Sequence, residues 1–117
     1  MTRRPTRRRP ASGARPSSIV WTDRAVSDLE AIGDHIARDD PSAAARWVAK
    51  LVDAAERVAT APLARGRVPE LGRDDVREAL LRSYRVVYRI DRGRVVVLTV
   101  FEGHRRLPAD VMDQDAP

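Results

Sequence analysis

Two arginines within one predicted strand are the leading candidates for binding a charged group. In the stretch SYRVVYRI, residues 83–90, Arg85 and Arg89 alternate with tyrosines and aliphatic residues. Since neighbouring side chains of a strand point to opposite faces, one face carries Tyr84, Val86, Tyr88 and Ile90 and the other carries the arginines. A planar guanidinium suits two-point recognition of a carboxylate or a phosphate. The arginine face therefore meets solvent, the carboxylates of a partner, or the phosphate of a substrate.

His104 could transfer a proton at neutral pH, because imidazole titrates with a pKa of about 6.5. It lies just after an apolar run and just before Arg105 and Arg106. Glu78 or Glu102 could act as its counterpart. The two arginines disfavour the cationic ring, and a histidine in such a place is more often a hydrogen-bonded residue at a strand end. We favour that structural interpretation and keep proton transfer as the alternative.

The composition excludes several kinds of site. None of the 117 residues is Cys, so disulfides, zinc-thiolate sites and thiol catalysis are ruled out, and we expect neither a metal nor a cofactor. The basic start of the chain lacks the apolar run of an export signal, and no stretch has the length and hydropathy of a membrane helix. We expect a cytoplasmic protein that does not enter a membrane.

The net charge of +5 comes from one end of the chain. Residues 1–18 hold six arginines and no acid, so the remaining 99 residues have a net charge of −1. We predict a disordered basic tail over 1–18, a domain over 19–108 and an acidic C-terminal tail over 109–117. The basic tail could hold a polyanion, although a dispensable extension is the simpler interpretation, and we expect no direct nucleic-acid binding outside it.

Two amphipathic helices are predicted in the first half of the domain. Apolar residues recur at spacings of three and four within 23–38, after Thr22, which can cap the helix. Asp40 and Pro41 then favour the start of a second helix that runs to about Thr60, because Asp is a preferred cap and Pro is tolerated in the first turn. Two helices joined by roughly two residues must fold back on each other as a hairpin.

The second half predicts a linker and three strands. The linker LARGRVPELGRDD is followed by VREALLR, YRVVYRI and RVVVLTVF, and the short stretch SIVWT before the helices is a further strand. The predicted fold class is α+β: a short N-terminal strand, then an antiparallel helical hairpin packed on one face of an antiparallel sheet, in the order β-α-α-β-β-β. The last strand is apolar on both sides, which favours a central position. The sheet face opposite the helices is expected to stay open to water or a partner.

The order of these features resembles the RelE/ParE superfamily of bacterial toxins from type II toxin-antitoxin modules, and in particular its ParE-like branch. The similarity runs from about Ile19 to Pro108. Its most specific pieces are Gly66-Arg67 with Pro69-Glu70-Leu71, Arg77-Glu78, Tyr84-Arg85-Val86-Val87-Tyr88 and His104-Arg105-Arg106.

The resemblance implies a small toxin that forms a hetero-oligomer with a cognate antitoxin, ParD-like or similar. In this superfamily the C-terminal segment of the antitoxin folds onto the helices and sheet of the toxin, and its N-terminal part binds operator DNA. RelE-like members cut messenger RNA in the ribosome, whereas ParE-like members poison DNA gyrase. The resemblance also implies partner-binding positions at Trp47, Arg67, Arg77, Arg85, His104 and Arg105.

Ribosome-dependent cleavage needs cations for the phosphate as well as a proton donor and a proton acceptor. By resemblance, Arg85 and Arg105 match arginines of the RNase members, with His104 and Glu78 as candidate proton-transfer residues. The lysines of those members are replaced by REALL, and their late tyrosine has no equivalent in LPADVMDQDAP. We therefore favour a toxin that binds gyrase and has no catalysis of its own. An mRNA endonuclease and a module member without toxicity are the alternatives.

The partner-binding residues also have structural interpretations. Gly66 and Arg67 are compatible with a tight turn that carries a solvated charge. Glu70 and Arg77 could pin the linker to the sheet, which we favour over a functional contact. Trp47 lies among apolar residues of the second helix, where packing in the core is the default expectation.

Overall fold

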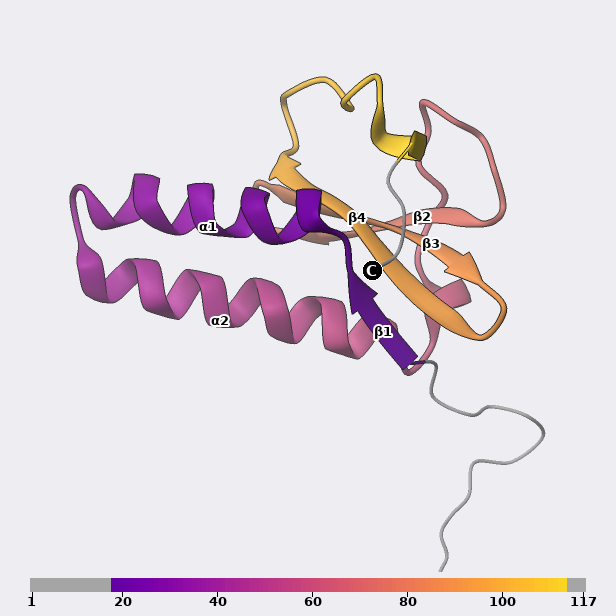
Figure 1. Cartoon of the computed structure of the whole chain (residues 1–117), viewed down its shortest axis with the longest axis horizontal. Coiled ribbons are helices and arrows are strands. Elements are labelled where there is room, and N and C mark those ends of the chain that lie inside the picture. The colour runs from indigo at the N-terminus through magenta and orange to yellow at the C-terminus, as the bar shows by residue number, and fades with distance from the viewer. Residues whose placement is uncertain (1–17, 114–117) are drawn as a thin grey trace, which may run out of the picture.

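The computed structural model describes residues 18–113, which form the fold predicted from the sequence (Figure 1). The elements follow one another as β1 (Ser18–Trp21), α1 (Asp23–Ala37), α2 (Pro41–Val58), the short 3-10 helix η3 (Pro62–Ala64), β2 (Val76–Leu81), β3 (Tyr84–Asp91), β4 (Arg94–Glu102) and the 3-10 helix η4 (Val111–Asp113). Within this range no helix is both long enough and apolar enough to cross a membrane.

Both helices begin at the predicted caps. The Thr22 hydroxyl accepts a hydrogen bond from the amide of Ala25, as expected, and it also lies 3.0 Å from the carbonyl of Val97 in β4, to which it donates. The Asp40 side chain accepts from the amide of Ala43, with Pro41 in the first turn of α2. The two helices form the predicted hairpin, and its far end extends beyond the sheet in Figure 1.

The four strands form one sheet in the order β1-β4-β3-β2, so the predicted central position of the last strand is confirmed. The pairs β2–β3 and β3–β4 are antiparallel, as predicted for the final three strands. The N-terminal strand β1, whose pairing the sequence left open, lies parallel to β4. Its last pair is Trp21 with Val97, whereas β4 continues to Glu102.

The helical hairpin covers one face of this sheet. Tyr88, Val86 and Val97 from the sheet are buried with Leu51 and Ala25 from the helices. Tyr84 and Ile90 are partly buried against the same cluster, so the predicted division of β3 into two faces is confirmed. Of the two alternating sets of β2 residues, the more apolar one, which contains Ala79 and Leu81, packs on this face.

The opposite face is covered as well, and the prediction that it stays open was wrong. Val68 and Leu71 from the linker and Leu107, Val111 and Met112 from the C-terminal segment pack over Val76, Val87, Val96 and Leu98 of the sheet. The physical reason is that the alternation that places Arg85 on this face also places these aliphatic residues there, and they must be removed from water.

The segment after Pro108, which we expected to form an acidic tail, therefore contributes Val111 and Met112 to this second cluster. The predictions for the basic tail, apart from Ser18, and for residues 114–117 lie outside the described residues.

Candidate functional site

Arg85 lies on the second sheet face, where two carboxylates hold its guanidinium. Its Nη1 and Nη2 donate to the two carboxylate oxygens of Glu70 at 2.9 and 2.8 Å, and its Nε donates to Glu78 at 2.7 Å. The guanidinium also lies 5.0 Å from the centre of the Phe101 ring. Only 8% of the residue is exposed, so the predicted availability of Arg85 to an outside macromolecule was wrong, although the linker and not the helical hairpin covers it.

Local backbone geometry brings the two carboxylates to Arg85. In the β2–β3 register Glu78 faces Val87, so it lies diagonally across from Arg85 on the same sheet face. The linker folds back along β2 through the Glu78 amide, which donates to the carbonyl of Gly66, and places Glu70 over the sheet. Hydrogen bonds from Arg85 lower the pKa of Glu70 to about 2, and the same bonds raise the pKa of Arg85.

A pocket of about 580 Å³ next to Arg85 brings together three of the four candidate RNase residues: Arg85, Glu78 and His104. His104 is the exposed one, with 72% of its side chain in solvent and its Nδ1 3.9 Å from Glu102. Arg105 lines a different groove, so the structure does not bring all four residues together. Arg85 is already paired with two carboxylates here, which leaves this candidate cation poorly suited to bind a phosphate.

Arg77 of β2 and Arg67 of the linker hold the linker in place. Arg77 donates to the carbonyls of Arg65 and Asp74 at 2.6 and 2.9 Å, and Arg67 forms an ion pair with Asp74 at 3.2 Å. These contacts agree with the interpretation that Glu70 and Arg77 pin the linker to the sheet. Neither arginine lines the pocket beside Arg85.

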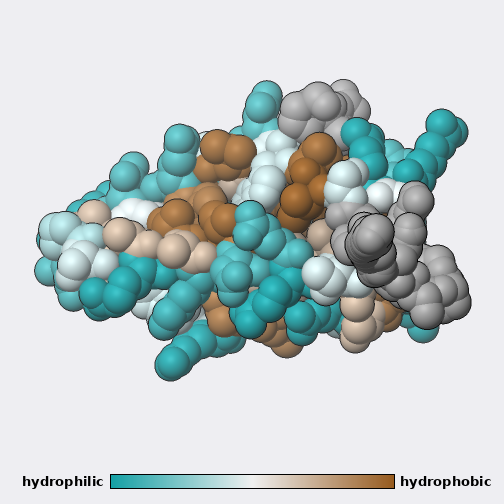
Figure 2. Space-filling model, turned by 90° about the horizontal axis from the view of Figure 1, so that it is seen from below, coloured by the Kyte–Doolittle hydropathy of each residue, from teal (hydrophilic) through white to brown (hydrophobic). Residues whose placement is uncertain are grey.

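Trp47 is half-buried where α2 meets the β2–β3 turn. Its ring centre lies 5.9 Å from that of Tyr84, and Lys50 and Arg82 place their cationic groups 5.0 and 5.8 Å from the Trp47 ring. On the face seen in Figure 2, hydrophobic residues reach the surface in patches along the helical hairpin, between hydrophilic side chains. Trp47 is therefore partly exposed with two cations beside it, an arrangement that suits contact with an acidic partner.

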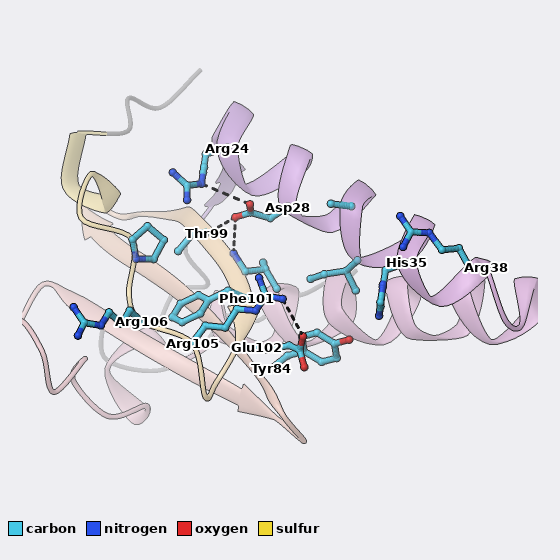
Figure 3. A pocket seen from close by; sticks show the side chains of 14 residues that line it. Arg24, Asp28, His35, Arg38, Tyr84, Thr99, Phe101, Glu102, Arg105 and Arg106 are labelled. Carbon is cyan, nitrogen blue, oxygen red and sulfur yellow. Dashed lines mark hydrogen bonds and ion pairs between the residues drawn. The ribbon is translucent and has the colours of Figure 1, made fainter.

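A second groove, of about 480 Å³, separates α1 from the end of β4 (Figure 3). One side is lined by Arg24, Asp28, Ile32 and His35 of α1 and by Arg38, which follows the helix. The other side is lined by Thr99, Val100, Phe101 and Glu102 of β4 with Arg105 and Arg106. Four arginines and two carboxylates among these residues give the groove a positive balance. Of this set Glu102, Arg105 and Arg106 were named from the sequence, and only Arg105 was predicted as a partner-binding position.

Asp28 organises this groove and was missed from the sequence. Its Oδ2 accepts hydrogen bonds from the Thr99 hydroxyl at 2.5 Å and from the Val100 amide at 3.1 Å, and its Oδ1 lies 3.6 Å from Arg24. The i,i+4 spacing of Arg24 and Asp28 was the available signal. That spacing predicts a surface ion pair, and only the tertiary structure shows that the carboxylate caps a strand edge.

Neither the pocket beside Arg85 nor the groove beside α1 contains a metal-binding arrangement of described residues. Across residues 18–113 no group of three or more His, Asp or Glu side chains is placed to hold a metal ion. The two sites offer paired charges and apolar surface, which suit the binding of a protein segment.

Comparison with known proteins agrees with this geometry. Residues 19–107 match the family model described as ParE toxin of type II toxin-antitoxin system, parDE. A protein of Sinorhizobium fredii named "Putative toxin Y4kP" is 41% identical over 92 residues, which cover 77% of this chain and 92% of that protein.

Two solved structures share the fold. A chain of the chromosomal ParDE toxin-antitoxin system from P. aeruginosa has a TM-score of 0.62 and 25% identity and covers 74% of this chain and 95% of its own. A chain of the toxin-antitoxin complex RelBE2 from Mycobacterium tuberculosis has a TM-score of 0.54 and 28% identity. The match covers 74% of the present chain and 98% of the RelBE2 chain. The family match spans both helices, the linker and all four strands from Ile19 onward, and so this chain belongs to the ParE toxin family of type II toxin-antitoxin systems, within the RelE/ParE superfamily.

Proposed function

We propose that this toxin acts by binding and inhibiting DNA gyrase or a related topoisomerase, and that a cognate antitoxin neutralises it by binding. The proposal requires no cofactor and no covalent chemistry from the chain itself. A cytoplasmic location follows from such a target.

The observation that supports binding over RNA cleavage is the state of Arg85. Three of the N–H groups of its guanidinium are engaged by Glu70 and Glu78, and the side chain is nearly buried. Cleavage of RNA requires cations that are available to stabilise the phosphate in the transition state. A cation that two carboxylates already neutralise would have to break strong charge-assisted hydrogen bonds before it could do so.

The antitoxin partnership is supported by the two structural neighbours, which come from toxin-antitoxin systems. This chain offers a suitable surface, since Trp47 and Tyr84 are flanked by Lys50 and Arg82, and the groove beside α1 carries four arginines. An acidic segment with apolar anchors would satisfy both features.

Brief induced expression in bacterial cells tests the target. Plasmid supercoiling and DNA breaks are followed beside protein synthesis and mRNA ends. We expect plasmid topoisomers to change first, before translation falls. Ends of mRNA at regular codon positions, with topology unchanged, would refute gyrase inhibition.

An mRNA endonuclease is the second candidate. The specific observation in its favour is that Arg85, Glu78 and His104 line one pocket, together with the structural similarity to a chain of RelBE2. The same experiment separates the two candidates. If neither topology nor mRNA changes and cells keep growing, the chain is a module member without toxicity.

A further inference from the structure

Strand β1 ends halfway along its neighbour β4. The last paired residues are Trp21 and Val97, after which Thr22 turns the chain into α1. The amide of Thr22 makes the final bond of this pairing, to the carbonyl of Val97. Beyond this point β4 continues to Glu102 with β3 on one side and no strand on the other within residues 18–113.

The backbone groups on this open edge can be identified from the β3–β4 ladder. The Gly103 amide donates to the carbonyl of Ser83, so Tyr84 and Glu102 form a non-hydrogen-bonded pair, and so do Val86 and Val100 two residues away. The amides and carbonyls of Val100 and Glu102 therefore point away from β3. This agrees with the position of Asp28, which accepts from the Val100 amide on that side.

Two of these four groups are satisfied within the described chain and two are not. Asp28 takes the Val100 amide, and the Glu102 carbonyl accepts from the amide of Arg105. The Val100 carbonyl and the Glu102 amide have no such partner among residues 18–113. In a parallel ladder, a residue of the added strand that lies opposite Phe101 would donate its amide to the Val100 carbonyl. Its own carbonyl would accept from the Glu102 amide. The open pair around Phe101 fits such a parallel strand in line with β1.

This edge forms the floor of the groove beside α1, which has room for a short extended segment (Figure 3). Among the charged side chains that line this groove, arginines outnumber carboxylates. Arg24 is paired with Asp28 and Asp110, and Arg105 is 3.8 Å from Glu102. Arg38 and Arg106 make no ion pair with another described residue, so an acidic occupant would find two available cations here.

We propose that an extended, acidic segment of the antitoxin occupies this groove and adds a short parallel strand to β4 in line with β1. This inference rests on the proposed antitoxin partnership and specifies how the partner binds. The backbone of the segment bonds to the Val100 carbonyl and the Glu102 amide, and its carboxylates pair with Arg38 and Arg106.

Hydrogen exchange of individual amides tests the strand addition. The probe is the full-length antitoxin, identified as the product of a neighbouring reading frame that relieves growth arrest when co-expressed. In the complex, exchange of the Glu102 amide should slow by at least about tenfold relative to the free chain. The Leu80 amide is the matched control, because it points outward on the opposite edge of the sheet, at β2, and should change little.

Two pairs of variants test the contacts. Glu102→Pro removes the amide hydrogen without breaking the ladder to β3, and should weaken antitoxin binding about tenfold, the contribution of roughly one hydrogen bond. Glu102→Ala keeps the amide and should bind at least as tightly as the unmodified chain. Arg38→Glu combined with Arg106→Glu should also weaken binding by about tenfold or more, whereas Arg46→Glu on the exposed side of α2 should not.

The outcomes distinguish this inference from the function on which it rests. If the antitoxin binds and neutralises while the Glu102 amide exchanges as in the free chain, strand addition is wrong and the toxin assignment stands. Protection of Leu80 in place of Glu102 would move the added strand to β2 and refute the site. If no neighbouring product relieves growth arrest, the antitoxin proposal fails and this inference fails with it.

Discussion

The guanidinium of Arg85 and the carboxylate of Glu70 form two parallel hydrogen bonds, 2.9 and 2.8 Å long, that join β3 to a linker residue 15 positions earlier in the chain. Glu78 on β2 completes the group. These bonds hold the linker over the second sheet face, where Val68 and Leu71 help to cover the aliphatic side chains. Arg85 is thus a structural residue first, and its substitution must be interpreted with folding in view.

Arg85→Ala should destabilise the chain by about 3–5 kcal/mol, because it leaves the nearly buried carboxylate of Glu78 without its partner. Urea unfolding of the purified variant measures the loss. Arg85→Leu combined with Glu78→Leu removes both charges and should recover most of the stability. If the single variant unfolds like the unmodified chain, the ion pair contributes little, and any loss of toxicity would indicate a direct contact with the target.

Acid should weaken the fold in a pH range set by Glu70. Arg85 holds the pKa of Glu70 at about 2 in the folded chain, against 4.5 for the unperturbed group. A lowered folded-state pKa means that the stabilisation is fully present above about pH 4.5 and is lost as the pH falls towards 2. Thermal unfolding across this range should show the loss, and Glu70→Gln should make the profile flatter. An unchanged slope in Glu70→Gln would show that other carboxylates dominate acid unfolding.

The Tyr88 hydroxyl should ionise at a higher pH than that of an ordinary tyrosine. Burial raises its pKa to about 12, and its hydroxyl donates to the carbonyl of Pro62. Because the folded-state pKa lies above the unfolded value, the stabilisation is complete below about pH 10 and is lost as the pH rises towards 12. Tyrosinate absorbance measures the titration. Tyr88→Phe should remove this step and cost about 1 kcal/mol for the lost hydrogen bond, and a tyrosinate step that persists in this variant at the same pH would assign it to Tyr84.

His104→Ala should leave toxicity within about twofold of the unmodified chain, because the ring is exposed and the binding mechanism needs no proton transfer from it. Colony counts after induced expression measure toxicity. Arg105→Ala is the comparison, since Arg105 lines the groove beside α1 and its loss should reduce toxicity or antitoxin affinity. Complete loss of toxicity in His104→Ala, with the fold intact, would favour the endonuclease.

Thr22→Ala should cost about 1–2 kcal/mol, because the buried hydroxyl caps α1 and also donates to β4. Thr22→Ser keeps the hydroxyl and serves as the matched control in the same thermal unfolding experiment. Equal stability of the two variants would mean that the cap contributes little here.

Much of the fold could be predicted from the sequence because its signals are local. The apolar spacing and the caps Thr22 and Asp40 act within a few residues, so they give the helices and their hairpin. Alternation within YRVVYRI likewise places Tyr88 under the helices. The central position of β4 followed from its apolar character on both sides.

Less of the candidate site could be predicted from the sequence. Trp47, Arg67 and Arg77 were recognised from the sequence. The groove beside α1, however, depends on where β1 ends relative to β4, and the sequence carries no signal for the pairing of these two strands. Asp28 looked like a surface acid until the strand edge that it caps was in place.

By itself the sequence determined the elements, their order and the two faces of β3, since each depends on the chemistry of neighbouring residues. Only the tertiary structure decided which carboxylates hold Arg85, that the second face is covered, and where an edge of the sheet stays open. Those features depend on contacts between residues far apart in the chain, whose choice among many possible partners is fixed by the packing of the whole domain.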